Sequence, residues 1–157
     1  MAKEVERKFL VSDESWRRLA ASSTTIEQFY LALGEGRSVR IRIKDGDKAL
    51  MTLKFGLTVR VRDEFEFPVP LEDALEMRAF AIGHRIDKTR YLVPHGGHVF
   101  EVDQFHGDLD GLVLAELETP DEVSAAALPS WLGPEVTGEA AYYNATLATL
   151  GPPAEPK

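Results

Sequence analysis

The chain has 157 residues, which suits one domain, because a domain of this size can bury most of the apolar surface of its unfolded form. Its net charge of −8 argues against a broad basic surface for nucleic acid, and the absence of cysteine excludes disulfides, thiolate metal sites and cysteine nucleophiles. No apolar run approaches bilayer length, and the charged start Met1-Ala2-Lys3-Glu4 is unlike a signal peptide. We therefore expect a cytoplasmic protein with no membrane contact.

Period-2 alternation of polar and apolar residues dominates positions 2–119, in short runs broken by Gly, Asp or Pro. This pattern is typical of antiparallel strands. It predicts eight strands, at roughly residues 3–11, 26–33, 37–45, 48–56, 58–68, 86–94, 98–106 and 112–119. Asp45-Gly46-Asp47 and Gly96-Gly97 predict tight hairpin turns.

Helical segments are predicted at roughly residues 13–21, 71–82, 120–127 and 138–150. Thr119-Pro120-Asp121-Glu122 has the composition of a helix start, with an N-cap threonine followed by proline at the first helical position. Gly151-Pro152 is a helix end signal. The chain is therefore interpreted as one domain over residues 1–150, followed by a flexible tail over residues 151–157.

Each predicted strand carries polar residues on one face and apolar residues on the other, and on nearly every strand the polar residues are charged. In the third strand, for example, Arg40 and Arg42 alternate with Val39 and Ile41. A solvated face explains any single strand, but like charges at i and i+2 on nearly every strand repel one another unless an opposite charge lies among them. The acids on this face are Glu4, Glu6, Glu64, Glu66, Glu101, Asp103, Glu116 and Glu118, and the bases are Lys8, Arg40, Arg42, Lys54, Lys88 and Arg90.

Carboxylates suit hard cations such as Mg²⁺ or Mn²⁺, and guanidinium groups suit phosphate oxygens. Closing eight strands into a barrel removes the sheet edges and leaves room inside for one small ligand. The predicted fold class is therefore α+β and mainly antiparallel β: an eight-stranded, closed, tunnel-like barrel with a polar interior and helices packed outside.

These residues together resemble the CYTH superfamily, the triphosphate tunnel metalloenzymes, whose hallmark is an N-terminal Glu-x-Glu-x-Lys. Here the motif is Glu4-Val5-Glu6-Arg7-Lys8. The resemblance continues in order through Gln28-Phe29-Tyr30-Leu31, Arg40-Ile41-Arg42, Thr52-Leu53-Lys54, Glu64-Phe65-Glu66, Lys88-Thr89-Arg90-Tyr91, Glu101-Val102-Asp103, Glu116-Leu117-Glu118, Glu135-Val136-Thr137 and Tyr142-Tyr143-Asn144. It implies a tunnel in which bases bind a triphosphate and acids hold one or two divalent ions, and the N-terminal motif looks most like that of bacterial inorganic triphosphatases.

Phosphoanhydride hydrolysis needs charge neutralisation and an aligned water more than a protein nucleophile. We predict that substrate is bound by Lys8, Arg40, Arg42, Lys54 and Arg90. Metal binding is assigned to Glu4, Glu6, Glu64, Glu66, Asp103, Glu116 and Glu118, with Mg²⁺ or Mn²⁺ as cofactor. Lys88 is the candidate for orienting or activating the water. Tyr30 is the candidate for handling a proton or positioning, although a barrel tyrosine with a purely structural role fits as well.

The predicted reaction is metal-dependent hydrolysis of inorganic tripolyphosphate to pyrophosphate and phosphate. A thiamine triphosphatase or a class IV adenylyl cyclase would use the same tunnel. A module that binds polyphosphate or a nucleotide without turnover is the alternative outside enzymes, but such a module would not need two Glu-x-Glu pairs. The expected partner is a small anionic substrate, not nucleic acid, and the sequence leaves a homodimer open.

Overall fold

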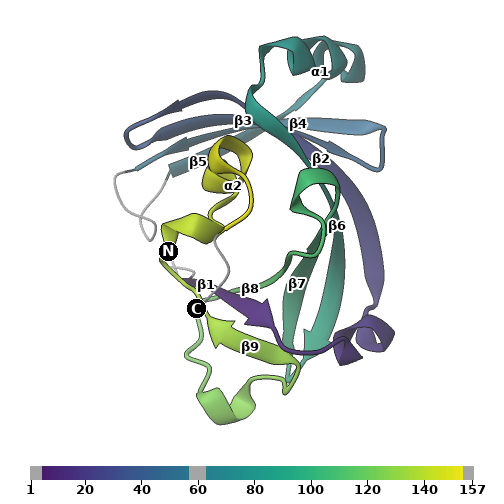
Figure 1. Cartoon of the computed structure of the whole chain (residues 1–157), viewed down its shortest axis with the longest axis vertical. Helices are drawn as coiled ribbons and strands as arrows, with labels where there is room; N and C mark the ends of the chain where they lie inside the picture. The colour runs from purple at the N-terminus through teal and green to yellow at the C-terminus, as the bar shows by residue number, and fades with distance from the viewer. Residues whose placement is uncertain (1–4, 57–62, 154–157) are drawn as a thin grey trace.

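A single curved antiparallel sheet forms the body of the protein in the computed structural model, which describes residues 5–56 and 63–153 (Figure 1). Within these residues the sheet has nine strands in the order β5-β4-β3-β2-β6-β7-β8-β1-β9. The strands are β1 (Val5–Val11), β2 (Ser22–Gly34), β3 (Arg37–Lys44), β4 (Lys48–Phe55), β5 (Asp63–Val69), β6 (Ile82–His95), β7 (His98–Phe105), β8 (Val113–Thr119) and β9 (Leu132–Glu135).

The ends of the sheet, β5 and β9, are not hydrogen-bonded to each other in the part of the chain that the structure describes. The predicted antiparallel α+β fold is confirmed, but closure into an eight-stranded barrel is not. The unpredicted β9 pairs with β1, where Phe9 lies opposite Glu135 and Val11 opposite Leu132. The free edge of β1 is thus covered by a short extra strand rather than by β5.

Two α-helices form in the described ranges, α1 (Leu71–Met77) and α2 (Asn144–Leu150). The remaining helical pieces are 3₁₀ turns, namely η1 (Ser15–Leu19), η2 (Arg78–Phe80), η3 (Gly107–Leu109), η4 (Ala125–Ala127) and η5 (Ala140–Tyr142). The predicted helix at 120–127 is therefore wrong. Thr119 ends β8, and its Oγ1 accepts a hydrogen bond from the Asp121 backbone N–H at 3.1 Å, which makes a local turn instead of a helix cap. No helix among the described residues has the length and apolar character needed to cross a membrane.

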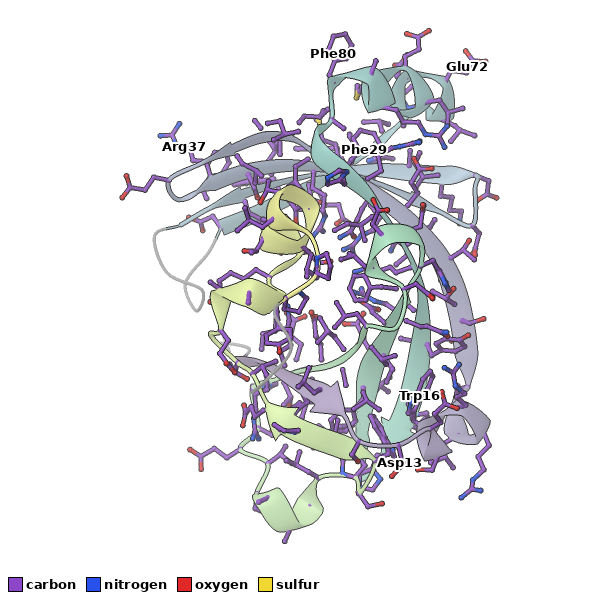
Figure 2. The ribbon with its side chains drawn as sticks, in the orientation of Figure 1. Asp13, Trp16, Phe29, Arg37, Glu72 and Phe80 are labelled. Carbon is purple, nitrogen blue, oxygen red and sulfur yellow. The ribbon has the colours of Figure 1, made fainter. Side chains whose placement is uncertain are left out.

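The outer face of the sheet carries two apolar clusters. Under α1, Ala74 packs with Phe29, Ile41, Ile43 and Ala49. At the other end of the molecule, Trp16 of η1 and Trp131 pack with Phe9, Val93, Phe100, Val102, Ala115 and Leu117. Figure 2 shows Phe29 beneath α1 and Trp16 far from it. These clusters confirm which residues of each strand were predicted to lie on its apolar face.

Helix α2 lies on the inner face of the sheet, whereas the predicted fold had its helices outside. Leu147 and Ala148 join a buried cluster with Tyr30, Ile86, Phe105, Leu109 and Leu114. Tyr30 follows Phe29 in β2, so the two side chains point to opposite faces, and Figure 1 shows α2 within the curve of the sheet. The backbones of α2 and β6 approach closely at Gly83, where an added Cβ would collide with the carbonyl oxygen of Ala148. Of the two α-helices only α1 occupies the predicted outer position. The predicted helix at 13–21 forms the 3₁₀ turn η1, whose Trp16 also packs on the outer face.

Candidate active site on the inner face of the sheet

Four basic side chains gather on the inner face, two on each strand that flanks β2. Arg40 and Arg42 come from β3, and Lys88 and Arg90 come from β6. Lys88 is 1% exposed and Arg40 9%, while Arg42 and Arg90 are partly buried. The structure therefore brings together four of the bases that the alternation pattern assigned to one face.

Asp103 of β7 holds the two β6 cations. Lys88 Nζ lies 2.8 Å from Asp103 Oδ2, and Arg90 Nε and Nη2 donate to the Asp103 carboxylate at 2.8 and 2.9 Å. Arg90 Nη1 also lies 2.7 Å from Glu101 Oε2. Burial alone would raise the pKa of Asp103, but Lys88 and Arg90 outweigh it and hold that pKa well below its ordinary value. Both oxygens of Asp103 are thus committed to cations of the protein.

Burial lowers the pKa of Lys88 from 10.5 to about 7, and the positive charges of Arg90 and Arg42 act in the same direction while Asp103 opposes them. Lys88 Nζ also donates to Asn144 Oδ1 at 3.1 Å. In its neutral form the amine has two hydrogens and one lone pair. With both hydrogens donated to Asp103 and Asn144, the lone pair is left to accept a proton.

The β3 cations have fewer partners. Arg42 Nε and Nη2 both donate to Gln28 Oε1, at 3.0 and 2.8 Å, and no carboxylate of the described residues forms a salt bridge with it. Burial, together with Arg40 and Arg90, lowers the pKa of Arg42 to about 10. Arg40 Nη2 reaches Thr52 Oγ1 only at 3.5 Å, and its Nε is buried with no hydrogen-bond partner in the described part of the chain. A buried donor of this kind calls for an acceptor, which a bound anion or a water can supply.

The acids gather mainly on the opposite side of the inner face. In the register of β1, β7 and β8, Glu6 lies opposite Glu118 and Glu101 lies opposite Glu116. Lys8 lies opposite Glu116, with Nζ 3.3 Å from Oε1, and donates to the backbone oxygen of Tyr142 at 3.0 Å. Facing carboxylates repel one another unless a cation lies between them.

These oxygen donors fit a hard divalent cation in their chemistry. Within residues 5–56 and 63–153, however, no three His, Asp or Glu side chains converge as a preformed metal group. Glu4, the other predicted ligand in the first motif, lies outside the described residues. The acid side therefore supplies suitable donors without a complete ligand cage.

The remaining predicted residues lie elsewhere on the inner face. Lys54 lies opposite Glu64 in the β4–β5 register, and Glu66 accepts a hydrogen bond from Thr52 Oγ1 at 3.1 Å. Both glutamates are exposed on the end strand β5, and strand pairing does not bring them to β1 and β8. Tyr30 is 6% exposed within the inner apolar cluster, a position that fits a packing role beside its register partner Arg40.

Two polar residues of the site were not predicted, Gln28 and Asn144. Gln28 is 0% exposed, and its Nε2 donates to Asn144 Oδ1 at 2.7 Å. Both residues stand in motifs that carried the family resemblance, Gln28-Phe29-Tyr30-Leu31 and Tyr142-Tyr143-Asn144, but neither was assigned a role in the site. That Asn144 contacts Gln28 and Lys88 became visible only once α2 was placed inside the sheet.

Most of the chain is similar to the CYTH domain family and to proteins named inorganic triphosphatase. The CYTH domain family matches residues 2–149. An inorganic triphosphatase of Acetivibrio thermocellus is 38% identical over 148 residues, which cover 94% of each chain, and one of Nitrosomonas europaea is 36% identical over 152 residues, which cover 92% of this chain and 96% of the relative. The crystal structure of the inorganic triphosphatase NE1496 matches with a TM-score of 0.73 and 33% identity, over 98% of this chain and 99% of that one. This chain therefore belongs to the CYTH domain family.

Proposed function

We propose that this protein hydrolyses inorganic tripolyphosphate to pyrophosphate and phosphate. The observation that carries the proposal is the group of buried cations on β3 and β6 whose hydrogen-bonding capacity is not met by acids: Arg42 contacts only an amide oxygen among the contacts described above, and Arg40 Nε has no partner in the described residues. The oxygens of a bound polyanion would supply the missing hydrogen-bond acceptors of Arg40 and Arg42. The names of the two relatives, at 38% and 36% identity, support the same substrate.

The proposed substrate-binding residues remain Lys8, Arg40, Arg42, Lys54 and Arg90. Charge-assisted hydrogen bonds from guanidinium groups to phosphate oxygens are strong and directional, so cations on neighbouring strands favour a substrate with several phosphates. A pyrophosphate has one phosphate fewer to engage them. We expect it to be a poor substrate for this reason.

We propose Glu4, Glu6, Glu116 and Glu118 as the residues that would hold a divalent cation, Mg²⁺ or Mn²⁺. When bound, such a cation would neutralise phosphate charge and lower the pKa of a coordinated water. Glu64 and Glu66 are proposed to assist from the end strand. Asp103 was predicted as a metal ligand, but we now assign it to positioning, because Lys88 and Arg90 engage both of its oxygens.

Lys88 is proposed as the proton acceptor. Water attacks the terminal phosphorus, the phosphoanhydride bond to the leaving pyrophosphate breaks, and the proton of the water passes to Lys88 Nζ. The lone pair of a neutral Lys88 is suited to this step, because the pKa is lowered to about 7.

The test is to incubate purified protein with tripolyphosphate, pyrophosphate, thiamine triphosphate or ATP, each with Mg²⁺, Mn²⁺ or excess chelator, and to measure phosphate and cyclic AMP. We expect phosphate from tripolyphosphate with either metal, little from pyrophosphate, and none in chelator. Cyclic AMP from ATP would point to a cyclase instead. Binding of tripolyphosphate without turnover would leave only a binding module.

A further inference from the structure

A continuous hydrogen-bonded path joins Arg42 to Lys88 through two neutral amides. Arg42 Nε and Nη2 donate to Gln28 Oε1 at 3.0 and 2.8 Å, and Gln28 Nε2 donates to Asn144 Oδ1 at 2.7 Å. Lys88 Nζ donates to the same Asn144 oxygen at 3.1 Å. The path therefore crosses from β3 through β2 and α2 to β6.

The choice of amides matters for charge. An amide oxygen accepts a hydrogen bond in nearly the same geometry as a carboxylate oxygen but brings no negative charge. A glutamate at position 28 or an aspartate at position 144 would order the same cations and cancel their charge. Among Arg40, Arg42, Lys88 and Arg90, carboxylates pair only with the two β6 cations, Asp103 with both and Glu101 with Arg90, in the part of the chain that the structure describes. This group of cations therefore keeps a surplus of positive charge at Arg40 and Arg42.

We propose that Gln28 and Asn144 are positioning residues, which hold Arg42 and Lys88 through neutral acceptors. Arg42 is thereby ordered while its charge stays available to an anionic substrate, and Lys88 is ordered without a further negative charge beside that substrate. This inference rests on the proposed function, in which that anion is tripolyphosphate. It also gives the inner position of α2 a role, since Asn144 is the first residue of that helix.

Isosteric acids separate this role from ordinary packing. In Asn144→Asp the oxygen that accepts from Gln28 and Lys88 is kept, so the melting temperature should stay equal or rise. Gln28→Glu gives Arg42 an ion pair but loses the donation from Nε2 to Asn144, so affinity and not the melting temperature is its criterion. In both variants the affinity for tripolyphosphate should fall by about tenfold or more, because each places a negative charge beside the phosphates and Glu at position 28 also competes with them for Arg42. Residues that only pack the interior would change stability without this fall in affinity.

The chain contains a matched control at Gln104. Its Oε1 accepts a hydrogen bond from Arg17 Nη1 at 3.0 Å, the same amide-to-guanidinium contact. Gln104 follows Asp103 in β7, so its side chain points to the outer face. Gln104→Glu adds the same charge to the protein as the two test variants, and its affinity for tripolyphosphate should match that of the wild type.

The experiment compares wild type and the three variants by thermal melting, by calorimetric titration with tripolyphosphate in excess chelator, and by KM and kcat from initial rates with Mg²⁺. For Gln28→Glu we expect KM to rise about tenfold with a much smaller change in kcat. Folded test variants with wild-type Kd and KM, or losses no larger than in Gln104→Glu, would overturn the inference. If Gln28→Glu does not fold, Asn144→Asp alone decides by the same criterion.

The same measurements distinguish a failure of the proposed triphosphatase function from a failure of the inference about Gln28 and Asn144. Wild-type protein that binds tripolyphosphate without releasing phosphate would overturn the triphosphatase assignment, and the Kd values of the variants would still decide the inference. Wild-type protein that neither binds nor hydrolyses tripolyphosphate would overturn both.

Discussion

The inner face has a cation side, on β3 and β6, and an acid side, on β1, β7 and β8, and the charged groups of the two sides have different partners. On the cation side, Lys88 and Arg42 are fixed by hydrogen bonds to neighbouring strands and to α2. On the acid side, Glu6 lies opposite Glu118 at more exposed positions, and like charges face each other across the strands. Arg42 and Lys88 are therefore ordered by groups of the protein. On the acid side Lys8 pairs with Glu116 at 3.3 Å and Arg90 with Glu101 at 2.7 Å, but no three acids converge as a preformed metal group in the described residues. If the proposed function holds, the phosphate-binding cations are preorganised and the metal site is not.

The largest effect is expected from breaking the centre of the cation side with Asp103→Asn. Lys88 and Arg90 would then be buried without their shared counter-charge, which should lower the free energy of unfolding by about 3–5 kcal/mol. Urea denaturation monitored by circular dichroism measures this. Asp121→Asn is the control, because Asp121 is exposed and contacts only His98 among the ion pairs of the described residues, at 3.0 Å. Equal losses in the free energy of unfolding would show that buried Asp103 contributes no more to stability than exposed Asp121.

Arg42→Ala should remove one phosphate contact from the preorganised side. We expect a loss of roughly 1.5–3 kcal/mol of transition-state binding, measured from kcat/KM for tripolyphosphate, with an unchanged requirement for Mg²⁺. Arg7→Ala removes an outer cation that pairs with Glu135 at 2.8 Å and should leave kcat/KM as it is. An Arg42→Ala protein rescued by added Mg²⁺ would mean that the two sides have been assigned in reverse.

The pH dependence of kcat/KM sharpens the role of Lys88. Because burial lowers its pKa from 10.5 to about 7, the neutral amine predominates above that pH. A proton acceptor must be neutral, so kcat/KM should rise about tenfold per pH unit below neutrality and level off above it. Lys88→Arg, which stays charged, should lose this rising limb. A rate that falls as pH rises through 7 would instead show that Lys88 acts as a phosphate-binding cation.

The smallest effect is expected on the acid side, from Glu116→Gln. An amide is a weaker metal ligand, so half-maximal activity should need roughly several-fold more Mg²⁺ or Mn²⁺, and added metal should restore part of the rate. Lys8 keeps its contact with the Tyr142 backbone oxygen in this variant, which limits the loss of substrate binding. A metal titration of initial rates measures the shift. An unchanged midpoint would remove Glu116 from the ligand set.

Alternation of residue type predicted much of the sheet, because the two faces meet different surroundings. Arg40 and Arg42 were placed opposite Ile41 and Ile43, and the structure buries the isoleucines under α1 while it turns the arginines inward. Strand β9 was missed because its four residues, Leu132–Glu135, include a proline and show no alternation. The apolar residues of α2 indicate that the helix packs, but not against which face of the sheet.

The partners within the site were less predictable than its members. Asp103 was correctly expected on the charged face, but its contact with Arg90 depends on the β6–β7 register, in which the two residues are directly opposite. Period-2 alternation alone does not set which residues of two strands face each other. The same limit concealed the contact between Gln28 and Asn144, whose side chains meet across 116 positions of the chain.

Asn144 reaches the inner face from α2, which follows every strand in the chain. A ribosome releases the strands first, so the curved sheet can begin to form before the residues of α2 have left the exit tunnel. Until α2 docks, Lys88 lacks its amide partner, and the apolar side chains around Phe105 and Leu114 face water. A nascent chain arrested before this helix would therefore expose an apolar inner surface. Chaperones could bind this surface, and it would also promote aggregation.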